Sequence, residues 1–146
     1  MTDRTPSTFL LGAGPVATAL AGALRRAGVP VLGLWARRWE AARAAGATSG
    51  VAFFADSFPA LLRQAEVVIV AVRDQAVGAV AERAVGEGRL SERVVLLHCS
   101  GATAAEEVFA AVRDRVGGVA TLHPLRAIAD GETGVHTMPG PLRPAL

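Results

Sequence analysis

A cluster of small residues near the amino terminus has the spacing of a phosphate-binding turn. The cluster follows an apolar run, matches the pattern G-x-G-x-x-A, and consists of Gly12, Ala13, Gly14, Pro15, Val16 and Ala17. In this pattern the first glycine permits a tight turn and the second lets the backbone approach a pyrophosphate, while the alanine lets the next helix pack closely. The pattern therefore predicts a dinucleotide site at a helix start, where free N–H groups hold phosphates. A plain glycine turn in an Ala- and Gly-rich chain is the alternative.

Two adjacent arginines follow the second apolar run. An NAD site usually places Asp or Glu about 20 residues after the glycines, to hold the ribose 2′-hydroxyl. This chain has Arg37 and Arg38 in that zone, and guanidinium groups suit a 2′-phosphate. We therefore predict NADP as the cofactor, with NAD as the less favoured choice and solvated edge arginines as the alternative. Trp35, just before them, either lies near the adenine or packs at the sheet edge.

Polar residues also follow three later apolar runs. They are Arg73 and Asp74 after Val72, Cys99 and Ser100 after His98, and Arg126 three positions beyond His123. Ligands of open α/β sheets bind at the carboxyl ends of the strands, so these side chains are candidates for a substrate pocket.

The chemistry of these side chains suggests roles and also plainer alternatives. His123 would donate or accept a proton near neutral pH, and Arg126 would hold an anionic substrate group. Asp74 and Ser100 have an alternative role as helix caps. For His98 the alternative is a core histidine with its own partner. For Cys99 a buried, inert thiol is favoured over a reactive one.

The composition excludes several other functions. Every one of the 15 cations is arginine, so Schiff-base chemistry and a P-loop lysine are excluded. A single cysteine excludes an intrachain disulfide, and the histidines lack the spacing of metal ligands, so we expect no metal site. The net charge is only +2 and the arginines are scattered, which argues against nucleic-acid binding.

Hydropathy argues against a membrane protein. No apolar run approaches the length of about 20 residues that spans a bilayer. Residues 8–24 are uncharged, but Gly12, Gly14 and Pro15 interrupt the continuous apolar helix of a signal peptide. Together with the single cysteine, this predicts a reduced, cytoplasmic setting.

Alternating apolar runs and helical patterns position these residues. The predicted strands are Thr8–Leu11, Val29–Trp35, Val51–Phe54, Glu66–Val72, Val94–His98 and Val119–Leu122. The predicted helices are Val16–Ala27, Trp39–Ala45, Ser57–Gln64, Gln75–Val85 and Ala102–Arg115. Gly28 ends the first of them and Gly46 the second. Because the strands are apolar throughout rather than alternating, they predict a parallel sheet covered on both faces. We expect one three-layer α/β domain over residues 1–128, doubly wound in the Rossmann manner, followed by a loop or disordered tail at 129–146.

The order of these segments resembles a known family. The resemblance covers roughly residues 8–128 and lies in the glycine loop, Ala36-Arg37, Val72-x-Asp74, the run from His98 to Ala102, and the run from Leu122 to Leu125. These segments resemble bacterial Rossmann-like oxidoreductases that join an NADP-binding domain to a helical C-terminal domain. That family is grouped with 6-phosphogluconate dehydrogenase-like proteins, pyrroline-5-carboxylate reductase and the deazaflavin-dependent NADP oxidoreductases.

The resemblance implies a distribution of roles. Gly12, Gly14 and Arg37 match cofactor-binding positions, and residues 72–74 match the segment that passes the ribose and nicotinamide. Ser100 and His123 match positions that line the substrate pocket. The resemblance does not supply the substrate. Our first hypothesis for the function is hydride transfer between NADP(H) and a small carbonyl, imine or alcohol substrate.

Family members continue for about another domain length beyond the end of this chain. We therefore keep a non-catalytic NADP-binding module or subunit as the second hypothesis. We also expect a homodimer or a separate subunit to cover apolar surface that the second domain would otherwise cover.

Overall fold

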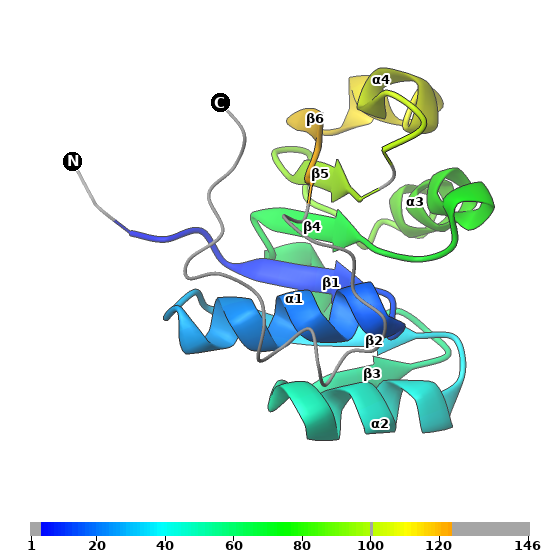
Figure 1. Cartoon of the computed structure of the whole chain (residues 1–146). Helices are drawn as coiled ribbons and strands as arrows, with labels where there is room; N and C mark the ends of the chain where they lie inside the picture. The colour runs from blue at the N-terminus through cyan, green and yellow to red at the C-terminus, as the bar shows by residue number, and fades with distance from the viewer. Residues whose placement is uncertain (1–3, 100, 124–146) are drawn as a thin grey trace.

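Six parallel strands form one sheet in the computed structural model, which describes residues 4–99 and 101–123 (Figure 1). The strands are β1 (Thr8–Leu11), β2 (Val31–Ala36), β3 (Phe53–Ala55), β4 (Val67–Val70), β5 (Val95–His98) and β6 (Gly118–Thr121). Their order in the sheet is β3-β2-β1-β4-β5-β6, and each neighbouring pair is parallel. The order reverses between β1 and β4, which is where doubly wound sheets bind their ligands. The expected α/β fold is confirmed.

Helices cover both faces of the sheet. Against one face lie α1 (Pro15–Arg26) and α2 (Trp39–Ser49), and against the other lie η1 (Ala60–Gln64), α3 (Val77–Gly86) and α4 (Ala105–Val108). Two short 3₁₀ turns, η2 (Asp74–Ala76) and η3 (Arg113–Arg115), complete the elements. Within the described part of the chain, no helix is both long and apolar enough to cross a membrane.

The central strand β1 explains why the predicted strands are apolar throughout. Phe9 and Leu11 lie in the core beneath α3 and η1, whereas Leu10 lies in the core beneath α1 and α2. All three side chains are fully buried. A strand covered on both faces needs apolar side chains at consecutive positions, and this pattern in the sequence predicts a buried parallel strand.

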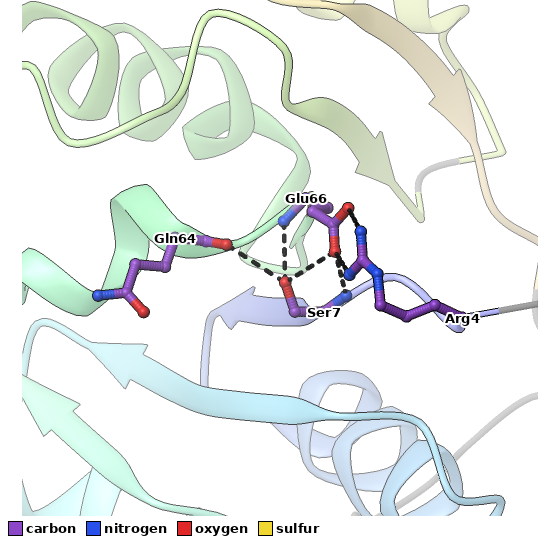
Figure 2. Close-up of polar contacts among 4 residues, drawn as sticks. All are labelled: Arg4, Ser7, Gln64 and Glu66. Carbon is purple, nitrogen blue, oxygen red and sulfur yellow. Dashed lines mark hydrogen bonds and ion pairs between the residues drawn. The ribbon is translucent and has the colours of Figure 1, made fainter. Parts of the chain in front are cut away.

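Polar contacts among Arg4, Ser7, Gln64 and Glu66, here called the staple, hold the segment before β1 in place (Figure 2). The Arg4 guanidinium donates to both Glu66 carboxylate oxygens, at 2.5 and 2.8 Å. The Ser7 N–H donates to Glu66 Oε1 at 3.1 Å, and the Ser7 hydroxyl donates to the Gln64 carbonyl at 3.2 Å. These bonds tie the segment before β1 to the start of β4, its partner in the sheet.

Helix α2 is longer than the sequence predicts. We expected it to end at Gly46, but it continues to Ser49 and ends at Gly50, which has a φ of +81°. Gly46 is a packing residue inside the helix, since a Cβ there would come within 2.9 Å of the Phe53 ring. The left-handed C-cap is therefore the next glycine along the chain.

Two other predicted helices are shorter and tighter than expected. In place of a helix over Ala102–Arg115, the chain forms α4 and then turns into η3. Ala105, Phe109 and Val112 are buried at helical spacing, which is why the sequence predicts a helix, but the Val112 N–H bonds to the Phe109 carbonyl three residues back. The predicted helix over Ser57–Gln64 likewise becomes the 3₁₀ helix η1. In both segments a tighter backbone buries the expected apolar residues.

Candidate functional site

The turn between β1 and α1 is held by backbone contacts from two neighbouring strands. The Gly12 N–H donates to the Trp35 carbonyl at 2.6 Å, and the Ala71 N–H donates to the Leu11 carbonyl at 2.8 Å. Gly12 has a φ of +138°, and a Cβ there would overlap the Ala71 carbonyl oxygen. Only glycine fits this position, because the backbone leaving β4 passes directly against it.

The second glycine of the turn serves a different purpose. Gly14 caps α1 with an ordinary φ of −78°, and no heavy atom outside its immediate chain neighbours lies within 4 Å of the position that its Cβ would occupy. Fold and backbone strain therefore do not require a glycine at this position. Its missing side chain leaves open space directly in front of the helix start, as the close approach of a ligand requires.

The first turn of α1 suits an anion. Pro15 occupies the first turn, no acidic residue lies there, and no side chain from the described residues caps the helix. The Thr18 hydroxyl instead donates back to the Gly14 carbonyl at 2.8 Å. The backbone N–H groups and the positive end of the helix dipole therefore face the open space beside Gly14.

A small hollow adjoins this helix start. It has a volume of about 240 Å³ and is lined by Ala13, Gly14, Pro15, Thr18, Ala44, Ala45 and Thr48. The lining residues come from the turn, α1 and α2, so both helices border the predicted phosphate position.

Arg37 and Arg38 lie at the carboxyl end of β2, as predicted. Both side chains are exposed, and Arg38 caps α2 with extended backbone. Among the described residues, neither arginine takes part in an ion pair. The next carboxylate along the chain is Glu40, already inside the first turn of α2. The two guanidinium groups are thus available to an anion at the edge of the sheet that carries Gly14.

The structure decides between the two interpretations of Trp35. Its side chain is only 3% exposed and lies in the core with the Phe58 ring 4.6 Å away, and its Nε1–H donates to the Asp56 carbonyl at 3.2 Å. Trp35 is therefore a packed aromatic of the sheet. The exposed tryptophan of this region is Trp39, which the sequence reasoning did not single out although it directly follows the two arginines.

The segment after β4 carries an exposed carboxylate. Val72 is half-buried, whereas Arg73 and Asp74 are exposed. The interpretation of Asp74 as the cap of the following helix is wrong, because α3 is capped by Ala76 without any side-chain bond and Asp74 starts the separate turn η2. The Asp74 charge instead acts on His98 at the end of the neighbouring strand.

His98 is the core histidine that the sequence offered as an alternative. It is fully buried, its Nε2 lies 3.0 Å from the Thr121 hydroxyl on β6, and its ring meets Phe109 edge-on with centroids 5.7 Å apart. Burial lowers the pKa of His98, while the nearby charge of Asp74 opposes that shift. Burial also raises the pKa of the half-buried Cys99 thiol to about 11, and this direction favours the neutral thiol, as the interpretation of an inert cysteine predicts.

His123 lies at the same edge of the sheet. It follows β6, is exposed, and its Cε1 lies 3.9 Å from the position that a Cβ on Gly101 would occupy. Its charge acts on His98, so His123, His98 and Asp74 gather at the carboxyl ends of β4 to β6. The other two residues of the predicted substrate pocket, Ser100 and Arg126, lie outside the described residues, as does the predicted tail 129–146. Across the described ranges, no three His, Cys, Asp or Glu side chains are grouped to hold a metal ion.

Comparisons with known proteins agree with this architecture. A family model described as NADP oxidoreductase, coenzyme F420-dependent, matches residues 8–101. No curated protein sequence matches the chain.

Several solved structures share the fold. A protein from Bacteroides fragilis, provisionally assigned as an NADP oxidoreductase, is 23% identical with a TM-score of 0.67, and the match covers 85% of this chain and 45% of that one. Prephenate dehydrogenase from A. aeolicus, solved with hydroxyphenyl propionate and NAD⁺, is 14% identical with a TM-score of 0.70 and coverages of 90% and 46%. The (S)-3-hydroxybutyryl-CoA dehydrogenase of Ralstonia eutropha is 16% identical with a TM-score of 0.68 and coverages of 83% and 50%. The chain thus spans about half the length of these structures.

Proposed function

Because the chain belongs to the family of coenzyme F420-dependent NADP oxidoreductases, we propose that it is a Rossmann domain that binds NADP(H). The observation that carries this proposal is the open backbone at Gly14. Neither the fold nor backbone strain requires this glycine, which begins a helix that no side chain among the described residues caps, at the point where the strand order reverses. A pyrophosphate fits there because the backbone N–H groups are exposed and a side chain would fill the space.

The preference for NADP over NAD rests on Arg37 and Arg38. Both guanidinium groups are exposed beyond β2, with no ion-pair partner among the described residues. A 2′-phosphate gains charge-assisted hydrogen bonds from such groups, whereas the 2′-hydroxyl of NAD prefers a carboxylate, which this position lacks.

The opposite end of the cofactor would lie beside β4 to β6. Residues 72–74 would run past the ribose and nicotinamide, because they follow the strand next to β1. When bound, the nicotinamide supplies hydride transfer to or from a small carbonyl, imine or alcohol substrate. His123 would donate or accept the proton, Ser100 would hydrogen-bond the reacting oxygen or nitrogen, and Arg126 would orient an anionic group.

A second candidate is a module that holds NADP(H) without turnover, as a sensor or as a subunit of a larger enzyme. The observations at Gly14 and Arg37 support it equally, because they concern the binding of the cofactor and not its reaction. Both candidates require the same cofactor site, and only the first requires turnover.

Calorimetric titration of the whole chain with NADPH and NADH tests the cofactor assignment. We expect NADPH to bind more tightly, and Arg37→Ala to weaken NADPH at least about tenfold, or about 1.4 kcal/mol, while leaving NADH unchanged. Arg26→Ala is the matched control, since this exposed arginine lies at the far end of α1. Failure of both nucleotides to bind would refute both candidates.

A second experiment tests turnover. Oxidation of bound NADPH by a panel of imines and carbonyls, lost in His123→Gln, would select the enzyme over the module.

A further inference from the structure

The outer edge of the sheet carries an unusual pair of aromatic side chains. β3 is the last strand in the sheet order, and α2 runs beside it (Figure 1). Trp39 at the start of α2 is 56% exposed and Phe53 of β3 is 36% exposed, and these are the large hydrophobic side chains that the described part of the chain exposes. Their rings meet edge-on at 6.0 Å. Exposed apolar groups gathered at one place mark an interaction surface more often than scattered ones do.

A hollow lies directly beside this pair. It has a volume of about 700 Å³ and is lined by Arg43, Ala44, Gly46, Ala47, Gly50, Val51, Ala52 and Phe53. Most of these residues are small, and two of them also have packing roles. A Cβ on Gly46 would press on the Phe53 ring, and a Cβ on Gly50 would press on the Arg25 guanidinium. An exposed aromatic pair and a depression therefore lie next to each other on one surface, and Phe53 belongs to both.

The charges on this surface also form a pair. Arg43 holds its guanidinium 5.5 Å from the centre of the Trp39 ring. Glu40 lies about one turn earlier on the same helix and is exposed. Among the described residues, neither charge takes part in an ion pair. One negative and one positive group thus follow Trp39 within the first turns of α2.

We propose that a second copy of this chain docks on this α2–β3 edge, defined by Glu40, Trp39, Arg43, Phe53 and the adjoining hollow. A two-fold axis places the aromatic pair of each copy against the hollow of the other, and Glu40 of each copy opposite Arg43 of the other. A two-fold interface uses the same patch on both subunits, so the patch must contain both a protrusion and a depression and both signs of charge. An unrelated partner would require only a protrusion or a depression, and only one sign of charge. The presence of both shapes and both charges on one patch therefore favours self-association. The interface also covers the free edge of β3, which would otherwise be open to unspecific strand pairing.

Sedimentation velocity of the whole chain, from about 1 to about 200 µM, tests the proposal. We expect a monomer–dimer equilibrium in the wild-type chain, and a dissociation constant at least about tenfold higher in Trp39→Ser and in Arg43→Glu. Both side chains are exposed, so circular dichroism should show both variants folded. Arg113→Glu makes the same charge change on the exposed turn before β6, at the opposite edge of the sheet, and should leave the constant unchanged.

A charge-swap experiment distinguishes a second copy of the chain from any other binding partner. Glu40→Arg and Arg43→Glu should each dimerise poorly alone, because like charges then face each other across the axis. An equimolar mixture should form heterodimers, since every contact again joins opposite charges. A wild-type chain that stays monomeric over the whole range, a dimer that Trp39→Ser and Arg43→Glu do not weaken, or a mixture that associates no better than its components would each overturn the proposal.

Discussion

At the scale of single residues, the two glycines of the turn after β1 separate structure from function. Gly12 has a backbone conformation that other residues rarely adopt and lies against Ala71, whereas Gly14 has ordinary dihedral angles and faces open space. The two glycines of this motif are therefore required for two different reasons. The first glycine is required by the fold, and the second only by something that approaches from outside.

Substitution of each glycine should expose this difference. Gly14→Val should fold normally and lower NADPH affinity by at least about tenfold, because its side chain fills the space of the pyrophosphate. Gly12→Ala should destabilise the fold by about 2–4 kcal/mol, because positive φ and overlap with Ala71 add together. Urea denaturation and calorimetric titration of the two variants check both effects. Equal stability of the two variants, or full NADPH affinity in Gly14→Val, would contradict this division.

The sequence predicts the position of the site residues better than their individual roles. The glycine loop, Arg37 and His123 all lie at the carboxyl edge of the sheet, because strand ends are set by the apolar pattern. The packing of Trp35 could not be predicted, since it depends on Phe58 and Asp56, which lie more than 20 residues away in the chain. Asp74 was misjudged for a similar reason: a cap depends on where the helix starts, and α3 starts three residues later.

At the scale of elements, the staple before β1 links a short terminal segment to the strand next to β1. Hydrogen bonds from Arg4 and Ser7 lower the pKa of the Glu66 carboxyl to about 2 from its ordinary value of 4.5. The ionised carboxylate accepts the bonds from Arg4 and from the Ser7 N–H, so these contacts depend on the charge of one half-buried residue.

The stability of the protein should depend on this charge. Because the pKa of Glu66 is lower in the folded state, its contribution to stability is complete above about pH 4.5 and disappears as the pH falls toward about 2. Glu66→Gln should therefore lower the melting temperature at neutral pH, and the difference from the wild type should shrink in acid. Melting curves between those pH values check it, with Glu92→Gln, an exposed carboxylate outside the staple, as the control. A difference that stays constant with pH would show that the charge is not the cause.

Helices are the elements that the sequence predicts least well. The strands are found because burial on both faces demands continuous apolar residues, as in β1 and β4. Over residues 105–112, helical spacing of buried residues correctly identifies which side chains face the core. It does not distinguish an α-helix from 3₁₀ turns, because both bury the same three residues.

At the scale of the whole molecule, one sheet joins two cores. The core beneath α1 and α2 and the core beneath η1, α3 and α4 are separated by the strands, yet β1, β2 and β4 each contribute side chains to both. If the shared strands come apart, the apolar side chains of both cores are therefore exposed to water. The sheet should make the two cores a single cooperative unit rather than two layers that unfold independently.

Urea unfolding should accordingly be one transition. Leu20 of α1 and Leu62 of η1 are fully buried in opposite cores, so each change to alanine should cost about 2–5 kcal/mol. Since the two residues belong to separate core clusters on opposite faces of the sheet, the double variant should show the sum within about 0.5 kcal/mol, with an unchanged dependence on urea. In a Trp39→Phe background the fluorescence comes from Trp35 alone, which reports the core of Leu62, while circular dichroism reports the whole chain. We expect the fluorescence and dichroism transitions to coincide in every variant. If the two transitions separate in Leu62→Ala, the two faces of the sheet unfold independently.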